Sequence, residues 1–282
     1  MSATATAPAK ALVDDFSLEM TGKDVEALEA AAHLIPQGTR INVTFLGNED
    51  LQMRTNAAAA VRRLGFEPIP HISARRISSE AEFTDFLKAL QDAAQPTKVF
   101  AVGGDPETPM GPYADSLSLI QTGLFQEHGI QEVNIAGYPE GTPVISEADL
   151  WDHLQRKDQA IKEQGLTGTI LTQFSFDTDP VTKWINDVRG HGVDLPIRVG
   201  VPGPAGIKRL LNYAKRFGVG SSAGIAKKYG LSLTTLLGTA GPDRFINDLA
   251  GQLTPASGEI RLHFYTFGGL AATSEWIQEF RK

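Results

Sequence analysis

The chain alternates short apolar runs with longer stretches in which apolar residues recur every three or four positions. Runs of the first kind predict buried strands, and stretches of the second kind predict helices with one apolar face. Eight such rounds can be followed along the chain. The predicted strands lie at 16–20, 40–46, 68–73, 98–105, 132–139, 168–177, 196–203 and 261–267, and a predicted helix follows each of them.

This alternation predicts the fold class. Strand–helix repeats build parallel sheets, and eight of them favour a closed (β/α)8 TIM barrel over an open doubly wound sheet. No G-x-G-x-x-G follows the first predicted strand, which also disfavours a dinucleotide-binding sheet. Segment 220–258 interrupts the rhythm, and we expect extra helices there, at 221–230 and 234–253, between the seventh helix and the eighth strand.

The N-terminus differs from the rest of the chain. Its first residues are mostly small and lack the apolar centre of a signal peptide. We therefore predict a flexible tail at 1–14 and a single catalytic domain at 15–282. No apolar run approaches the length that spans a membrane, and we expect a cytoplasmic protein.

Composition narrows the possible functions. Asp and Glu number 33 against 26 for Lys and Arg, a net charge of −7 without a basic run, which disfavours nucleic acid as a partner. The absence of cysteine excludes disulfides, thiolate nucleophiles and zinc–cysteine sites. No helix-spaced histidine pair indicates a metal site, and none is expected. The apolar helices are compatible with a homo-oligomer, which we expect.

Polar residues occur where the predicted strands end. In a (β/α)8 barrel the active site lies at these ends and in the loops that follow. Taken singly, each residue has a structural explanation: His71 could be a hydrogen-bonded core histidine, and Gly103–Pro106 could be a turn. Their convergence predicts a binding site. The residues are Glu19, Thr44, His71, Gly104, Asp105, Tyr138, Gln173 and Tyr265.

Four segments carry a resemblance to a known family. KVFAVGGDPE, VNIAGYPEG, TILTQFSFD and LHFYTF occur in this order, after a Glu that ends the first predicted strand. Together they resemble the 5,10-methylenetetrahydrofolate reductase family over about residues 16–267. The resemblance implies a barrel that binds FAD and passes a hydride from NADH or NADPH, through the flavin, to methylenetetrahydrofolate. The product would be 5-methyltetrahydrofolate, and the reverse direction is also possible.

The resemblance implies two catalytic residues and one that recognises the substrate. Glu19 matches the general acid, which protonates a folate amine as the imidazolidine ring opens. Asp105 matches a carboxylate that favours the cationic iminium form of the substrate. Gln173 matches an amide that hydrogen-bonds the folate. An amide both donates and accepts, as the pterin edge requires.

Further binding residues follow from the same resemblance. Contacts to FAD are implied for Thr44, His71, Gly104, Asp105, Tyr113, Ala114 and Tyr138, and contacts to its phosphates for Arg156 and Lys157. Substrate contacts are implied for Arg209, Tyr213 and Tyr265, in addition to Gln173.

The sequence also departs from the family pattern. Gly103 replaces an arginine, Thr142 replaces a histidine, and Gly268 and Gly269 replace an asparagine and a basic residue. Two alternatives therefore stay open. A flavin-independent reductase would take the hydride directly from NADH, whereas a non-catalytic homologue would only bind folate. Retention of both Glu19 and Asp105 disfavours the non-catalytic homologue. No feature indicates a methyltransferase that uses a corrinoid.

Overall fold

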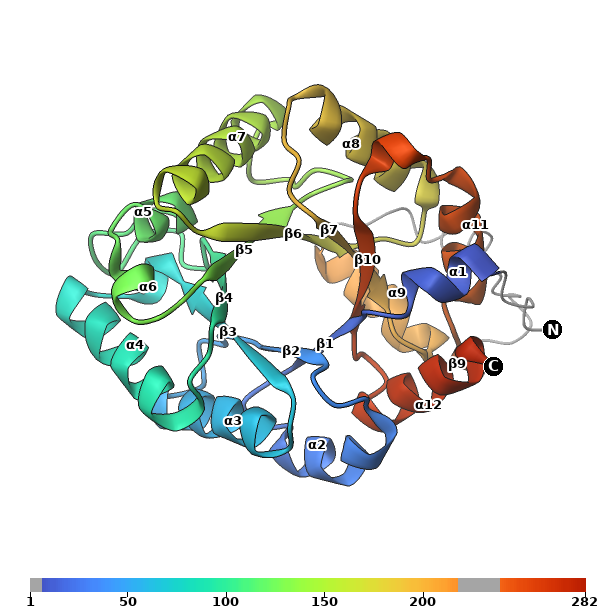
Figure 1. The fold of residues 1–282 in the computed structure, drawn as a ribbon, viewed down its shortest axis with the longest axis horizontal. Helices are drawn as coiled ribbons and strands as arrows, with labels where there is room; N and C mark the ends of the chain where they lie inside the picture. The colour runs from blue at the N-terminus through green and yellow to red at the C-terminus, as the bar shows by residue number, and fades with distance from the viewer. Residues whose placement is uncertain (1–6, 218–238) are drawn as a thin grey trace.

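The structure is a computed structural model that describes residues 7–217 and 239–282. A closed barrel of parallel strands forms its centre, and helices surround it (Figure 1). The barrel strands are β1 (Ser17–Met20), β2 (Arg40–Val43), β3 (Glu67–Ser73), β4 (Lys98–Val102), β5 (Glu132–Gly137), β6 (Thr167–Phe174), β7 (Ile197–Pro202) and β10 (Ile260–Tyr265). The ring closes where β1 pairs with both β2 and β10. The predicted (β/α)8 barrel is confirmed.

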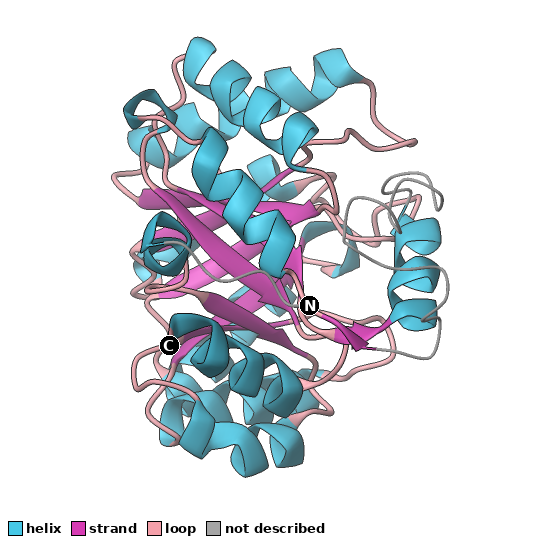
Figure 2. Cartoon of the chain, turned by 90° about the vertical axis from the view of Figure 1, so that its right-hand side faces the viewer, coloured by secondary structure: helices cyan, strands magenta, loops and turns pink. Residues whose placement is uncertain are grey.

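Helices follow the strands along the chain and cover the outer face of the barrel. Figure 2 shows this arrangement from the side, with the strands between layers of helix. The helices are α1 (Ala7–Leu12), α2 (Val25–Ala31), α3 (Leu51–Arg63), α4 (Glu80–Ala94), α5 (Ser116–Ile120), α6 (Leu124–Glu127), α7 (Glu147–Glu163), α8 (Thr178–Gly190), α9 (Ile207–Phe217), α11 (Asp243–Gln252) and α12 (Leu270–Arg281). A small antiparallel sheet pairs β8 (Ala205–Gly206) with β9 (Thr239–Ala240).

Short polar side chains start several of these helices. Ser79 accepts a hydrogen bond from the backbone N–H of Glu82 at 3.1 Å and begins α4. Asp50 begins α3 and Asp177 begins α8 through equivalent bonds of 2.7 and 3.2 Å. Such caps satisfy backbone donors that the first helical turn leaves free. Some polar residues after the strands therefore have a structural role.

The region between α9 and β10 contains an additional helix, α11, but it begins at Asp243, and Thr239 and Ala240 of the predicted helix 234–253 form β9 instead. The predicted helix at 221–230 lies outside the described residues. At the other end of the chain the structure corrects the predicted flexible tail, because α1 packs against α11 and β10. Ala9 and Val13 are completely buried there. The boundaries of the single domain stay a prediction.

The barrel interior has an apolar middle layer. Alternate side chains of a barrel strand point inward, and Ile69, Phe100 and Leu171 form a cluster separate from the main core. Lys98 lies two residues before Phe100 and His71 lies two residues after Ile69, so polar side chains share this inward face on both sides of the layer. The layer therefore separates two polar ends of the barrel.

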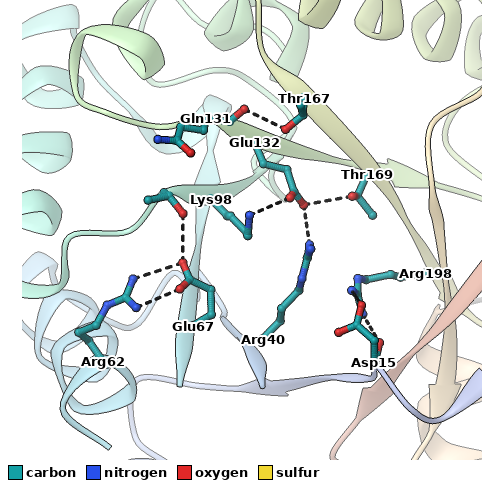
Figure 3. A network of polar contacts seen from close by, with 11 residues as sticks. Asp15, Arg40, Arg62, Glu67, Lys98, Gln131, Glu132, Thr167, Thr169 and Arg198 are labelled. Carbon is teal, nitrogen blue, oxygen red and sulfur yellow. Dashed lines mark hydrogen bonds and ion pairs between the residues drawn. The ribbon is translucent and has the colours of Figure 1, made fainter. Parts of the chain in front are cut away.

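A network of charges fills the N-terminal end of the barrel (Figure 3). Glu132 on β5 accepts from Arg40 Nη1 at 2.7 Å and from Thr169 Oγ1 at 3.0 Å, and it pairs with Lys98 Nζ at 3.0 Å. Burial alone would raise the pKa of Glu132, but Arg40 and Lys98 hold it below its usual value. Nearby, Arg198 pairs with Asp15 at 2.6 Å. The contacts of Glu132 join β2, β4, β5 and β6, and the Arg198–Asp15 pair joins β7 to the segment before β1.

Among the described residues, no helix is both long enough and apolar enough to span a bilayer.

Replacing Glu132 with glutamine tests how much this network contributes to the free energy of unfolding. The amide keeps the shape of the side chain but leaves Arg40 and Lys98 without a countercharge in a mostly buried place. We expect the free energy of unfolding to fall by about 2 to 3 kcal/mol in urea denaturation. The control is Glu29→Gln, because the Glu29–Arg63 pair lies on the surface and should contribute less than about 1 kcal/mol. Equal losses in the two variants would contradict the prediction.

Candidate active site

Glu19 lies near the C-terminal end of β1, next to a buried histidine that the sequence analysis did not select. Its Oε2 is 3.8 Å from Nε2 of His263 on β10. The other ring nitrogen of His263, Nδ1, lies 2.9 Å from Ser17 Oγ. Burial lowers the pKa of His263, and Glu19 opposes this only in part. A neutral imidazole therefore bonds the Ser17 hydroxyl at Nδ1 and faces the Glu19 carboxylate at Nε2, which has no hydrogen-bond partner among the described residues.

His71 on β3 faces the same volume. Its ring packs edge-on against Phe100 with 4.7 Å between the centroids, and its Nε2 is buried without a hydrogen-bond partner among the described residues. Burial lowers the pKa of His71 to about 4, while the charge of Glu19 acts in the opposite direction. His71 is therefore neutral at physiological pH and has a free polar atom.

Gln173 lies within an irregularity in β6, and Tyr265 binds the residue before it. The pairing of β6 with β7 shifts register between Leu171 and Phe174, and Tyr265 Oη donates to the carbonyl of Thr172 at 3.1 Å. Such bulges often reorient a side chain next to a site. Burial raises the pKa of Tyr265 well above its usual value, and the charges of Glu19 and Tyr138 add to this. Glu19, His71, Tyr138 and Tyr265 therefore lie within electrostatic reach of one another.

Two more of the predicted cofactor residues have free buried groups. Thr44 Oγ1, just after β2, and Tyr113 Oη, in the loop after β4, are buried without a partner among the described residues. Tyr113 is held by an edge-on contact with Phe83 of α4, at 5.6 Å between centroids. Buried polar groups are normally hydrogen-bonded. Thr44, Tyr113 and His71 thus each keep one buried polar atom without a hydrogen-bond partner among the described residues.

Asp105 is oriented by a neighbouring loop. Arg76, which follows β3, donates Nε and Nη2 to the two carboxylate oxygens at 2.7 and 2.6 Å. These hydrogen bonds hold the pKa of Asp105 below its usual value, although its side chain is 74% exposed. Arg75 donates to the carbonyl of Ala114 at 2.7 Å. Gly104 has a φ of +96°, which favours glycine where the loop leaves β4.

The two basic residues of α7 have different surroundings. Arg156 is exposed and pairs with Asp152 at 3.2 Å. Lys157 is buried, and burial lowers its pKa to about 8 while Asp115 partly opposes this. Consecutive helix positions point about 100° apart, so the two side chains lie in different surroundings. The structure does not bring Arg156 together with the other predicted residues.

Arg209 and Tyr213 form a separate group on α9. Tyr213 stacks on Phe267 with 4.0 Å between centroids and 9° between the rings. Arg209 donates to the carbonyl of Phe267 at 2.9 Å. Phe267 in turn lies against Tyr265, at 5.8 Å between centroids. A row of three aromatic side chains, Tyr213, Phe267 and Tyr265, therefore connects α9 with the group around Glu19 and His71.

The chain is similar to a known family over most of its length. The family model described as methylenetetrahydrofolate reductase matches residues 15–225, which is more than half of the chain. The chain belongs to the methylenetetrahydrofolate reductase family. The match includes Glu19, His71, Asp105 and Gln173.

Named members of the family are more distant. "Methylenetetrahydrofolate reductase 2" of Saccharomyces cerevisiae is 28% identical over 177 residues, which cover 59% of this chain and 28% of that protein. "Methylenetetrahydrofolate reductase (NADH) 1" of Arabidopsis thaliana is 30% identical over 128 residues, or 41% of this chain and 22% of that protein. The chain therefore spans less than a third of either relative.

Solved structures share the fold at low sequence identity. A Clostridium thermocellum protein that binds two copies of 5-methyl-5,6,7,8-tetrahydrofolic acid superposes with a TM-score of 0.62, at 11% identity and 94% coverage of both chains. A Yersinia pestis DHPS with a bound pterine-sulfa conjugate gives a TM-score of 0.50, at 13% identity, over 100% of this chain and 98% of that one. At these identities the likeness shows the fold alone.

His263 was not among the residues selected from the sequence, but the sequence pattern could have indicated it. His263 and Tyr265 are two residues apart in the family segment LHFYTF, so they share one face of the strand. Arg76 gave no comparable signal, because its pairing with Asp105 joins two loops that only the fold brings together. Within the described residues, no group of three His, Asp or Glu side chains could hold a metal ion.

Stability should depend on pH through His71. Its pKa is about 4 when folded, against a usual 6.5, so the unfolded chain binds the proton more readily. The stabilisation that this difference in the pKa of His71 gives to the folded state is fully present above pH 6.5. It is lost as the pH falls towards 4, by about 3 kcal/mol in total. We expect His71→Gln to reduce the difference in unfolding free energy between pH 7.5 and pH 5 by most of this amount.

The exposed His33 provides the matched control. His33→Gln should leave the pH dependence measured by urea denaturation unchanged. A His71→Gln protein whose stability falls between pH 7.5 and pH 5 as steeply as that of the unsubstituted protein would contradict the assignment.

Proposed function

We propose that this chain interconverts 5,10-methylenetetrahydrofolate and 5-methyltetrahydrofolate by hydride transfer, with FAD as carrier and NADH or NADPH as the hydride donor. The observation that carries the proposal is the contact of Glu19 with neutral His263 at 3.8 Å, inside a barrel of this family. Binding of 5-methyltetrahydrofolic acid by the Clostridium thermocellum protein of the same fold supports folate as the substrate.

The residues near β2, β3 and β4 fit a flavin. Thr44 Oγ1, His71 Nε2 and Tyr113 Oη are buried and have no partner among the described residues. A flavin edge carries both donors and acceptors that such groups can pair with. When bound, FAD would supply the ring that accepts the hydride and passes it to the folate. The chain would contribute the position and orientation of that ring.

Glu19 is well placed to deliver a proton. The Ser17 hydroxyl can either donate to His263 Nδ1 or accept from it, at 2.9 Å. Neutral His263 can therefore accept a hydrogen bond at Nε2 from protonated Glu19, or donate one there to its carboxylate. The proton that Glu19 gives to a folate amine would leave a carboxylate that His263 can stabilise. General acid catalysis of this kind contributes about 10² to 10⁴ in rate.

Two further groups would hold the substrate. The carbonyl of Thr172, next to Gln173, is fixed by the hydroxyl of Tyr265 at 3.1 Å, which limits the positions that the Gln173 amide can take. The bidentate bonds from Arg76 keep Asp105 ionised and oriented at the rim. An ionised carboxylate there would favour a cationic iminium over the closed ring.

Direct hydride transfer from NADH without a flavin is the second candidate. The departures at Gly103, Thr142 and Gly269 favour it, because each removes a side chain that could bind a flavin or its phosphates. Arg156, exposed and paired with Asp152, does not replace them. The three free polar groups of Thr44, His71 and Tyr113 support FAD instead.

Substitution of Glu19 by glutamine tests the proposed acid. The amide keeps the size of the side chain but has no proton to give. We expect the rate of 5-methyltetrahydrofolate formation to fall by about 100-fold or more in an anaerobic assay with FAD and NADH or NADPH, with little change in the KM for the folate.

The matched control is Glu26→Gln, because Glu26 is exposed on α2 and its loss should leave the rate unchanged. A Glu19→Gln protein that keeps its activity within about threefold would remove Glu19 from the mechanism. Absence of product from the unsubstituted protein would contradict the proposed function itself.

A further inference from the structure

A cavity of about 490 Å³ lies at the N-terminal end of the barrel. The apolar middle layer of the barrel separates it from Glu19 and His71. Its lining comes from the first residues of β2, β5, β6, β7 and β10 and from the C-terminal part of α7. The volume lies within the range of small-molecule sites, about 300 to 1,000 Å³. The candidate active site uses none of the residues that line this cavity.

Three arginines share the cavity because of the register of the strands. Arg198 on β7 is the direct partner of Arg261 on β10, and residues level with each other on parallel strands point to the same face of the sheet. Arg40, the first residue of β2, lines the same cavity. Burial lowers the pKa of Arg198, and the positive charge of Arg40 lowers it further. The fold therefore places like charges near one another at this end of the barrel (Figure 3).

The carboxylates inside this end of the barrel are already shared or engaged. Glu132 is the countercharge of both Arg40, at 2.7 Å, and Lys98, at 3.0 Å. Glu67, at the start of β3, accepts two hydrogen bonds from Arg62 of α3, at 2.9 and 3.2 Å. Figure 3 shows both groups. One carboxylate thus serves two bases, and the other is bound by a base from outside the barrel.

The remaining two arginines of the cavity are weakly compensated. Asp15 pairs with Arg198 at 2.6 Å, but its side chain is 53% exposed. Arg261 has Glu259 at 3.7 Å, a distance too long for a hydrogen bond. Its Nη1 donates to the backbone carbonyl of Ile260 at 3.0 Å. Positive charge therefore exceeds its close countercharge around Arg198 and Arg261.

The last acid of the lining, Asp194, acts on a base outside the cavity. Burial lowers the pKa of Arg189, and the charge of Asp194 partly opposes this. Every carboxylate that lines the cavity therefore has a basic neighbour, and none of them leaves an uncompensated negative charge that would repel an anion.

Donor groups of the arginines are still available. A guanidinium carries five N–H donors. Within the described residues, Arg40 donates through Nη1 to Glu132, and its Nε and Nη2 have no hydrogen-bond partner. Neither of these two atoms is among the buried polar atoms without a partner, so both are accessible to a ligand. Arginine forks match the oxygens of phosphate and carboxylate groups.

We propose that this cavity binds a phosphate dianion, either free or as part of a small monoester, between Arg40, Arg198 and Arg261. Three guanidinium groups that come from three strands suit the oxygens of a tetrahedral anion better than a single carboxylate. The anion would supply the missing countercharge and would bond β2, β7 and β10 to one another. Beside the arginines, the apolar residues Ile161, Leu166 and Leu195 also line the cavity, next to the organic part of a monoester. The site is independent of the proposed reductase activity.

Calorimetric titration of the full-length protein with inorganic phosphate tests the site without turnover. Sodium chloride keeps the ionic strength constant, so that general screening contributes no signal. We expect a dissociation constant of about 1 mM or below. Arg261→Gln should weaken the binding about tenfold or more, because it removes one charge-assisted contact. Arg63→Gln, which changes a surface ion pair with Glu29, should leave it unchanged.

Two further measurements support the assignment if Arg261→Gln folds poorly. Arg40→Lys keeps a positive charge beside Glu132 but loses the planar fork, and it should also weaken phosphate binding about tenfold. In urea denaturation, phosphate should raise the unfolding midpoint of the unsubstituted protein above its value in sodium chloride of equal ionic strength. Arg40→Lys should lose that increase.

The outcomes separate the site from its alternatives. Lack of phosphate binding by the unsubstituted protein would overturn the inference. So would binding that neither Arg261→Gln nor Arg40→Lys weakens, because the ion would then lie elsewhere. Glycerol 3-phosphate that binds more tightly than phosphate would assign the site to a monoester, and equal or weaker binding would assign it to free phosphate. No result of this series bears on the reductase reaction, so the two proposals stand or fall separately.

Discussion

The closure of eight parallel strands into one ring is the constraint on which the site depends. Residues on adjacent strands come into register because β1 pairs with β2 on one side and with β10 on the other. This closing pair brings Ser17 level with His263 and places Glu19 beside the imidazole. Residues 17 and 263 are almost a chain length apart, so no local structure could form this contact. An open sheet would leave Glu19 on an edge strand in water.

The two polar ends of the barrel differ in how their buried groups are satisfied. At the N-terminal end, Glu132 has cationic and hydroxyl partners within 3.0 Å, as a stabilising end of the fold requires. At the other end, polar atoms of Thr44, His71 and Tyr113 lack partners among the described residues. Each such atom costs the folded state about 1 to 3 kcal/mol. A barrel that retains this cost at its C-terminal end has the pattern of a binding site.

Much of this arrangement follows from the sequence. The alternation of predicted strands and helices was sufficient to predict the barrel. The positions at the ends of the predicted strands led to the selection of Glu19, His71 and Tyr265. Periodicity could also have found His263, since it shares a strand face with Tyr265. The Arg76–Asp105 pair could not be found in this way, because it depends on how two loops meet. Arg156 and Lys157 are neighbours in sequence but differ in burial, because a helix turns about 100° per residue. The burial of Ala9 and Val13 likewise depends on α11, which the chain reaches more than two hundred residues later.

The most direct test of the proposed flavin route follows the hydrogen that enters the methyl group. Hydrogen carried by a flavin exchanges with solvent, whereas a hydride passed directly from the nicotinamide does not. With FAD, unlabelled NADH and methylenetetrahydrofolate in deuterated water, the flavin route predicts one deuterium in the methyl group of 5-methyltetrahydrofolate, read by mass spectrometry. With deuterated NADH in ordinary water, it predicts none. Deuterium that arrives from NADH would contradict the flavin route, and the absence of methyl product would contradict the reaction.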